Sequence, residues 1–281
     1  VEYYNIMEKT LYCIRHGYAL HNKLFCDIGP RAYSEYRDTQ LLEKGFNQAK
    51  TLNKTWKELK DIQLVIVSPC QRTLDTSTFI FQHINVPTIA KDFLIEYPLG
   101  GAEICNQRKD LSDLRYMYPY IQFEDFPNKL IWSNERETKI ELNNRIEHLL
   151  DWIGTRRETR IAIVSHSSFI GQMKDGIIGD ENHELKHCHP YKIKAKYSHE
   201  KKFISMKETE ETEQGGTQNA KYKIEIKEIT NPTIPLEISS VKHHTLEVTE
   251  VDSSTGKQKD GTHPKYFALF GKAQEGELSL T

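Results

Sequence analysis

Three short apolar runs stand out in the first 170 residues of the chain, at residues 10–14, 64–67 and 161–164. Each run is almost continuously apolar, which is the pattern of a strand buried on both of its faces. Two other segments, at about residues 43–59 and 141–153, repeat apolar residues every three or four positions and so predict amphipathic helices. Strands that alternate with helices predict an α/β fold, in which helices flank a mainly parallel sheet on both faces.

The last part of the chain follows a different pattern. Residues 207–219 are polar, charged and glycine-containing, which predicts a linker or a mobile loop. Beyond them, short segments at 222–226, 236–238 and 246–248 alternate apolar and polar residues, as half-buried strands do. We therefore expect a main α/β domain over residues 1–206, a linker over 207–219 and a small β-rich extension over 220–281.

Composition and charge argue against a nucleic-acid or membrane partner for this protein. The 281 residues include 38 basic and 40 acidic side chains, with a net charge of -2, so no basic excess suggests a nucleic-acid partner. No apolar run is as long as a membrane-spanning helix, and the N-terminal residues are too polar for a signal peptide, so we expect no membrane association. The five cysteines are irregularly spaced and odd in number, which favours reduced thiols and a cytoplasmic location.

Reactive polar residues follow each of the three apolar runs. The first run leads into Arg15-His16-Gly17, the second into a segment that contains Arg72, and the third into His166. In open α/β sheets, ligands bind beyond the carboxyl ends of the strands. We therefore expect two imidazoles and two guanidiniums to meet at one edge of the sheet.

These side-chain types suit an anionic, tetrahedral ligand. A guanidinium is always charged and forks onto two oxygens, so it binds phosphate well. A neutral imidazole nitrogen can attack phosphorus and form a covalent phosphohistidine, while nearby cations stabilise the charge of the transition state. Gly17 has no side chain and lets the backbone approach a phosphate closely. The pattern predicts a site for phosphoryl transfer.

The motifs and their order resemble the histidine phosphatase superfamily, the phosphoglycerate mutase-like group. The similarity extends over about residues 8–200 and rests on Arg15-His16-Gly17 with Asn22, on residues 41–45 and 68–76, and on Ser165-His166. The stretch over residues 105–121 is similar, more weakly, to a segment of the plant and fungal phosphoglycerate mutase-like branch. The combination is far more specific than the Arg-His-Gly triplet alone.

The resemblance implies a role for each matching residue. His16 would be the phosphorylated nucleophile, Asn22 would contact the phosphoryl group, and the phosphate clamp would consist of Arg15, Arg72 and His166. Residues 94–96 match the Leu-x-Glu setting in which the family often places its proton donor, so Glu96 is the candidate acid. Its carboxyl group must stay protonated to serve the leaving alkoxide. The resemblance implies neither a metal nor another cofactor.

Two departures from the family pattern affect the expected substrate. Tyr18 stands where many members have an acidic or amide residue, and Ser167 stands where many have glycine. The recognition segments of cofactor-dependent glycolytic mutases are absent, so we favour a phosphatase that acts on a small phosphorylated metabolite. The alternatives are a phosphomutase of the phosphoglycerate mutase type and a pseudo-enzyme that binds phosphate-bearing partners. The sequence motifs do not indicate an oligomeric state.

Simpler interpretations remain open for several of these residues. His166 could be only a helix N-cap, Arg72 could merely begin a helix, and Glu96 could be a solvated loop carboxylate. A further cluster has the composition of a metal site but no matching second pair of ligands, so a polar loop with a buried Cys188 is favoured; its members are His183, His187, Cys188 and His189. Ser165-His166 could belong to a serine hydrolase, but no Gly-x-Ser-x-Gly elbow is present.

Overall fold

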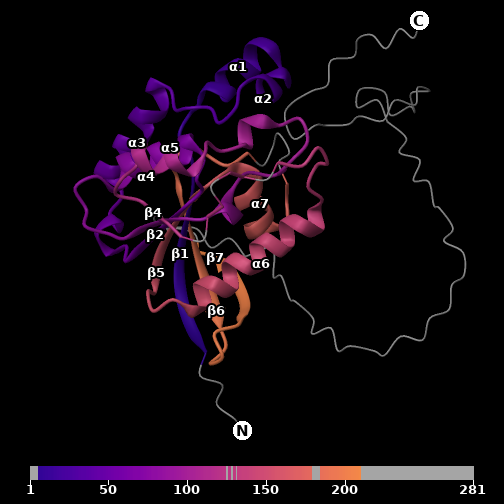
Figure 1. Ribbon diagram of the computed structural model, residues 1–281. Coiled ribbons are helices and arrows are strands. Elements are labelled where there is room, and N and C mark those ends of the chain that lie inside the picture. The colour runs from indigo at the N-terminus through magenta and orange to yellow at the C-terminus, as the bar shows by residue number, and fades with distance from the viewer. Residues whose placement is uncertain (1–5, 125, 128, 131, 179–183, 210–281) are drawn as a thin grey trace, which may run out of the picture. The chain divides into compact units, whose positions relative to one another are not determined.

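The computed structural model describes residues 6–124, 126–127, 129–130, 132–178 and 184–209. These residues contain one seven-stranded sheet of order β4-β3-β2-β5-β1-β6-β7 (Figure 1). The first five strands along the chain run parallel to one another: β1 (Met7–Arg15), β2 (Leu64–Val67), β3 (Thr88–Ala90), β4 (Gln122–Phe123) and β5 (Arg160–Ser165). The remaining two, β6 (Pro190–Tyr197) and β7 (Phe203–Glu208), form antiparallel pairs at one side of the sheet. The predicted α/β fold with a mainly parallel sheet is confirmed.

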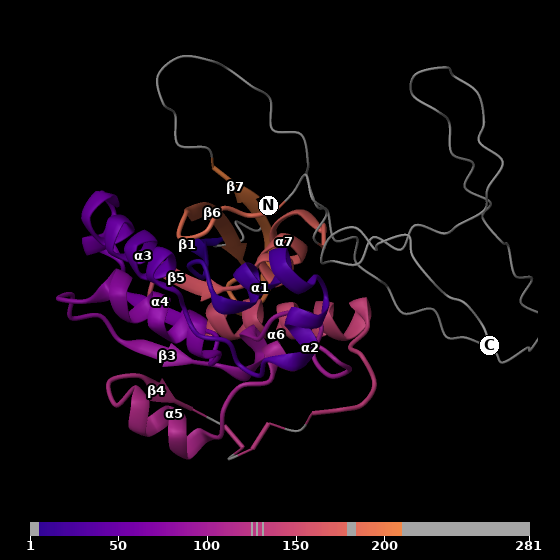
Figure 2. The ribbon, with the colours of Figure 1, turned by 90° about the horizontal axis from the view of Figure 1, so that it is seen from above.

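Helices cover both faces of this sheet (Figure 2). On one face lie α3 (Glu43–Thr55) and α4 (Gln71–Phe81), and on the other lie α6 (Lys139–Thr155) and α7 (Ser167–Asp175). The other helical elements are α1 (Leu20–Ile28), α2 (Arg31–Glu35), α5 (Leu111–Met117) and three 3-10 turns, η1 (Leu59–Asp61), η2 (Asp92–Leu94) and η3 (Ile104–Asn106). Among the helices of the described part, none is long and apolar enough to cross a membrane.

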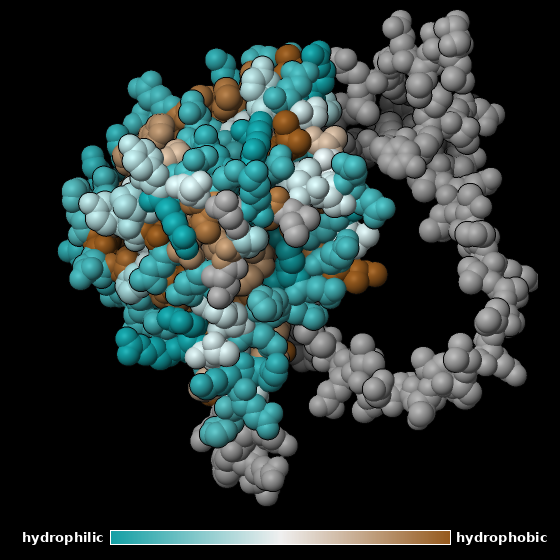
Figure 3. All heavy atoms as spheres, in the orientation of Figure 1, coloured by the Kyte–Doolittle hydropathy of each residue, from teal (hydrophilic) through white to brown (hydrophobic). Residues whose placement is uncertain are grey.

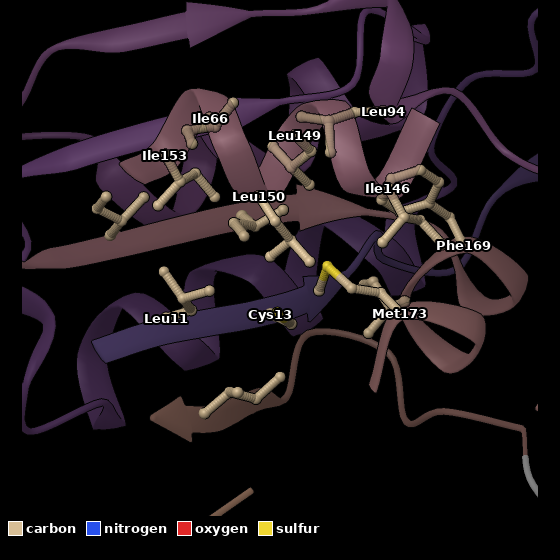
Figure 4. Close-up of a cluster of buried hydrophobic side chains, with 14 of the residues drawn as sticks. Leu11, Cys13, Ile66, Leu94, Ile146, Leu149, Leu150, Ile153, Phe169 and Met173 are labelled. Carbon is tan, nitrogen blue, oxygen red and sulfur yellow. The ribbon is translucent and has the colours of Figure 1, made fainter. Parts of the chain in front are cut away.

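The strand β1 shows why a continuous apolar run predicts a central strand. Successive side chains of a strand point to opposite faces, so each face of a doubly covered strand must be apolar. Leu11 and Cys13 enter the cluster beneath α6 and α7, whereas Tyr12 and Ile14 enter the cluster beneath α3 and α4. Figure 4 shows the first of these clusters, where Leu11 and Cys13 lie below the apolar face of α6.

The two helices predicted from periodicity are both present. α6 begins with a capping box in which Thr138 and Glu141 satisfy each other's backbone N–H groups, and its apolar residues face the core. α3 ends at Thr55, four residues before the predicted end, and Leu59 belongs instead to the turn η1. The surface seen in Figure 3 is mostly hydrophilic, with apolar residues scattered over it rather than gathered in one patch.

The C-terminal boundary of the sheet differs from the prediction. β6 and β7 extend the sheet beside β1, and β7 ends at Glu208, so residues 207 and 208 of the predicted linker lie in a strand. Their polar character reflects an edge strand, whose outward side chains meet solvent. The rest of the predicted linker from residue 210 onward, and the predicted extension over 220–281, lie outside the described residues.

Candidate active site

The carboxyl ends of three neighbouring strands bring the predicted residues together. β2, β5 and β1 are adjacent and parallel, with Val67 paired to Val164 and Arg15 paired to Ser165. Beyond the strands, the backbone N–H of His16 donates to the carbonyl oxygen of Ser165 at 3.0 Å. The rings of His16 and His166 consequently lie 5.2 Å apart, centroid to centroid.

His16 lies at the centre of this site and is 2 % exposed. Its Nδ1 is 2.8 Å from the carbonyl oxygen of Gly17. A carbonyl oxygen only accepts hydrogen bonds, so Nδ1 carries the proton and Nε2 is unprotonated. Burial, followed by the nearby charge of Arg72, lowers the pKa of His16 well below its ordinary value. His16 is therefore a neutral imidazole at neutral pH with a lone pair on Nε2.

His166 is the N-cap residue of α7 and is completely buried. Its Nε2 lies 2.8 Å from the hydroxyl of Ser68, at the end of β2. Burial and the charge of Arg72 lower the pKa of His166 as well. Nδ1 of His166 is buried and makes no hydrogen bond within the described part of the chain.

The two guanidiniums are anchored by their outer nitrogens. Arg72 donates to the carbonyl oxygen of Cys105 at 2.7 Å and to Oδ1 of Asn106 at 2.9 Å. Arg15 donates to the carbonyl oxygen of Leu185 at 2.6 Å and pairs with Glu184 at 2.6 Å.

The inner nitrogen of each guanidinium lacks such an anchor. Nε of Arg15 and Nε of Arg72 are buried and have no hydrogen-bond partner among the residues that the structure describes. Together with Nδ1 of His166, they are three unpaired polar atoms on side chains next to His16. Unpaired buried donors are costly, and an anion that accepts from them would remove that cost.

Glu96 lies against the first turn of α7, the helix that begins after His166, rather than in a solvated loop. Its carboxylate accepts hydrogen bonds from the backbone N–H groups of Tyr97 at 2.8 Å, Ser168 at 3.2 Å and Phe169 at 3.0 Å. The last two belong to the first turn of α7, where the helix dipole favours an ionised carboxylate. Burial has the larger effect, however, and raises the pKa of Glu96 above its ordinary value.

Asn22 occupies the first turn of α1, where its Oδ1 accepts from the backbone N–H of Ala19 at 3.0 Å. This bond does not use the two N–H donors of the amide. The preceding residue, His21, belongs to the site although the sequence analysis did not select it. Its ring lies 5.4 Å from that of His16, and its Nδ1 lies 2.6 Å from the hydroxyl of Thr39. Its position next to Asn22 in the motif was the available signal.

A second histidine that the sequence analysis did not assign to the site is His187. Its Nδ1 donates to the backbone oxygen of His16 at 2.6 Å, and the next residue, Cys188, donates its N–H to the backbone oxygen of Arg15. Burial and the charge of Arg15 lower the pKa of His187 to about 4. Residues 184–188 thus bind the Arg15-His16 backbone along one side of the site.

The metal cluster considered from the sequence is not assembled by the described residues. They include no group of three or more His, Cys, Asp or Glu side chains placed to hold a metal ion, and His183 lies outside them. Cys188 is buried, as the polar-loop interpretation expects.

Gly17 is constrained by packing as well as by any ligand. A Cβ atom on Gly17 would lie 2.7 Å from the carbonyl oxygen of Gly45, and a Cβ atom on Gly45 would collide with the backbone of Tyr18. The backbone N–H of Gly17 donates to the hydroxyl of Thr76 at 2.9 Å. The two glycines therefore let the loop after β1 lie directly against the start of α3.

The strand ends of this α/β sheet surround a neutral histidine with unpaired guanidinium and imidazole groups, a set of side chains that suits an anionic ligand. A sequence model described as the histidine phosphatase superfamily (branch 1) matches residues 11–198. The chain belongs to this superfamily, as its motifs predict.

The chain is also similar to named proteins from plants and fission yeast and to solved structures. The chain is 29% identical over 217 residues to phosphoglycerate mutase-like protein 1 of Arabidopsis thaliana, covering 65% of this chain and 74% of the relative. It is 28% identical over 172 residues to a protein of Schizosaccharomyces pombe named probable phosphatase, covering 57% of this chain and 74% of the relative. Among solved structures, a mycobacterial glucosyl-3-phosphoglycerate phosphatase superimposes with a TM-score of 0.47 at 13% identity, covering 72% of this chain and 97% of that structure.

Proposed function

We propose that this protein is a metal-independent phosphatase that hydrolyses a small phosphorylated metabolite through a phosphohistidine at His16. The observation that carries the proposal is the neutral His16 ring with its Nε2 lone pair, together with unpaired buried polar atoms on the neighbouring side chains of Arg15, Arg72 and His166. Such a set suits the oxygens of a phosphate monoester dianion, and its positive charge reduces the repulsion that the dianion exerts on a nucleophile.

In the first step, Nε2 of His16 attacks phosphorus in line with the ester oxygen. The N–P bond forms while the P–O bond to the alcohol breaks, and Glu96 gives its proton to the departing oxygen. Arg15 and Arg72 stabilise the charge on the three equatorial oxygens. The products of this step are the free alcohol, phospho-His16 and an ionised Glu96.

In the second step, the ionised Glu96 takes a proton from water as the water oxygen attacks phosphorus. The N–P bond breaks, inorganic phosphate leaves, and His16 and protonated Glu96 are restored. The raised pKa of Glu96 supports this double role, because a carboxyl group needs a pKa nearer neutrality to donate and accept a proton in turn. Asn22 would add its amide N–H groups to the phosphoryl oxygens.

A phosphomutase would share the first step and differ in the second, where an alcohol rather than water accepts the phosphoryl group. The names of the plant relatives refer to phosphoglycerate mutase, whereas those of the fission yeast relatives refer to phosphatase. Product analysis separates these outcomes directly.

The test is a screen of the full chain against phosphate monoesters, with phosphate release and isomer formation measured together. We expect phosphate release that persists in EDTA and that falls by about 10⁴-fold or more in His16→Ala. His199→Ala, which replaces an exposed histidine, is the matched control and should keep full activity. Loss of activity in EDTA, full activity in His16→Ala, or isomer formation without phosphate release would each contradict the proposal.

A further inference from the structure

Glu96 itself belongs to no helix or strand, so contacts from other elements hold the segment that carries it. It follows the turn η2 and leads into residues 97–99, so its own secondary structure does not fix the carboxylate. A proton donor must lie within hydrogen-bond reach of the ester oxygen, and small displacements lower its efficiency strongly. The contacts that hold residues 93–99 therefore bear directly on catalysis.

Arg145 of α6 binds the first part of this segment. Its Nη1 donates to the backbone oxygens of Phe93 at 2.9 Å and of Ile95 at 2.8 Å, and Ile95 directly precedes Glu96. The guanidinium also lies over the ring of Phe169, 5.3 Å from its centroid. Phe169 is one of the residues whose N–H binds the Glu96 carboxylate. Phe169 and Ile146, the residue after Arg145 on α6, belong to the same buried cluster, which Figure 4 shows.

Glu137 binds the other part of the segment. Its Oε2 accepts from the N–H of Leu99 at 2.9 Å, and its own N–H donates to the oxygen of Leu99 at 2.8 Å. Glu137 in turn forms a two-pronged pair with Arg145, with N–O distances of 2.6 and 2.7 Å. The Arg145–Glu137 ion pair thus binds both ends of the segment, at residues 93–95 and at Leu99.

The pair is well shielded from solvent. The side chain of Arg145 is 14% exposed and that of Glu137 is 5% exposed, so the interaction is little screened by salt. The contacts of Arg145 use the planar fork of its guanidinium, whose geometry a lysine ammonium cannot reproduce. Within the described residues, neither side chain forms a hydrogen bond or ion pair with Arg15, Arg72 or His166, although the charge of Arg145 contributes to the lowered pKa of His166.

We propose that Arg145 and Glu137 are positioning residues that hold Glu96 where it can protonate the leaving group. This inference rests on the proposed function, in which Glu96 is the acid of the first step. Glu96 acts in both steps, but kcat/KM reports the first step, in which the alcohol departs. A displaced Glu96 slows that step only where the departing oxygen needs a proton. An alkyl phosphate releases a strongly basic alkoxide and depends on the acid, whereas p-nitrophenyl phosphate releases a stable phenolate and does not.

The test compares glycerol phosphate with p-nitrophenyl phosphate for the full chain and for Arg145→Lys and Glu137→Gln. We expect kcat/KM to fall by about 100-fold for the alkyl phosphate in both variants and by no more than about twofold for the aryl phosphate. The alkaline limb of the alkyl phosphate pH profile, which reports protonated Glu96, should flatten. Arg157→Gln, at a side chain that is 96% exposed, is the matched control and should change neither substrate.

Each result decides the inference. Equal losses for both substrates would show a general structural role, and unchanged alkyl phosphate turnover would show no role, so either result overturns it. If Arg145→Lys does not fold, Glu137→Gln decides alone. If the wild-type protein hydrolyses neither substrate, the proposed phosphatase function is contradicted as well. If the wild type is active but the variants lose activity equally on both substrates, only the positioning role is contradicted.

Discussion

The hydroxyl of Ser68 lies 2.8 Å from Nε2 of His166, although 98 positions separate the two residues in the chain. This contact joins the end of β2 to the start of α7. When Ser68 donates to Nε2, the proton of the neutral ring resides on Nδ1, which then becomes a donor for a bound phosphate. The buried hydroxyl of Ser68 thus sets the tautomer of His166 and makes Nδ1 a hydrogen-bond donor.

Ser68→Ala should lower kcat/KM by about fivefold, because the loss of one hydrogen bond of about 1 kcal/mol lets the His166 ring turn and change tautomer. Steady-state kinetics with any substrate found in the screen measures this effect. Ser112→Ala removes an exposed hydroxyl and serves as the control. Unchanged activity in Ser68→Ala would mean that Ser68 does not set the state of His166.

Gly45→Ala should lower the free energy of unfolding by about 2 kcal/mol or more, because the added Cβ atom would collide with the backbone of Tyr18, which cannot yield as a side chain can. Activity should fall as well, since Tyr18 directly follows the Arg15-His16-Gly17 motif. Urea denaturation and kinetics test both effects.

Gly176→Ala provides the comparison for this change. Gly176 has a φ of 70°, and a Cβ atom added there would meet no other atom within 4 Å. Alanine at this position should therefore cost only about 1 kcal/mol, from the left-handed backbone alone, and leave activity intact. Equal effects of the two substitutions would contradict the packing argument.

Stability should depend on pH through His187. Its pKa is 6.5 in an ordinary setting and about 4 in the folded protein, so between these values the unfolded chain binds a proton that the folded protein does not. The free energy of unfolding should therefore fall as the pH drops below 6.5, by up to about 1.4 kcal/mol per pH unit from this residue.

His187→Gln tests this dependence. The substitution removes the titrating group, so urea denaturation at a series of pH values from about 7.5 down to about 4.5 should show a shallower decline than in the wild type. His199→Gln, at an exposed position, should leave the decline unchanged. A variant that declines as steeply as the wild type would show that other groups carry the effect.

The central strands and the main site residues follow from the sequence because their signals are local. β1, β2 and β5 are apolar runs that end in reactive residues, and parallel strands bring those ends to one edge. The sequence pattern of strands β6 and β7 is less distinctive. Polar residues, among them Lys194 and Lys196, alternate with apolar ones there, because these strands lie at the margin of the sheet.

The residues that the sequence did not reveal act through long-range contacts. His187 reaches the backbone of His16 from 171 positions away, in a segment whose histidines have no regular spacing. Arg145 lies among other polar residues of α6 and has the pattern of a solvated helix position, yet it binds a segment 50 positions earlier. Such contacts depend on the packing of whole elements, which local periodicity does not encode.

The most direct test of the account is to trap the covalent intermediate. The full chain is mixed with isotopically labelled p-nitrophenyl phosphate, quenched in alkali to preserve phosphohistidine, digested and mapped by mass spectrometry. The account predicts label on Nε2 of His16, absent in His16→Asn and present in His199→Ala. Label on another residue, or turnover by His16→Asn at the wild-type rate, would contradict it.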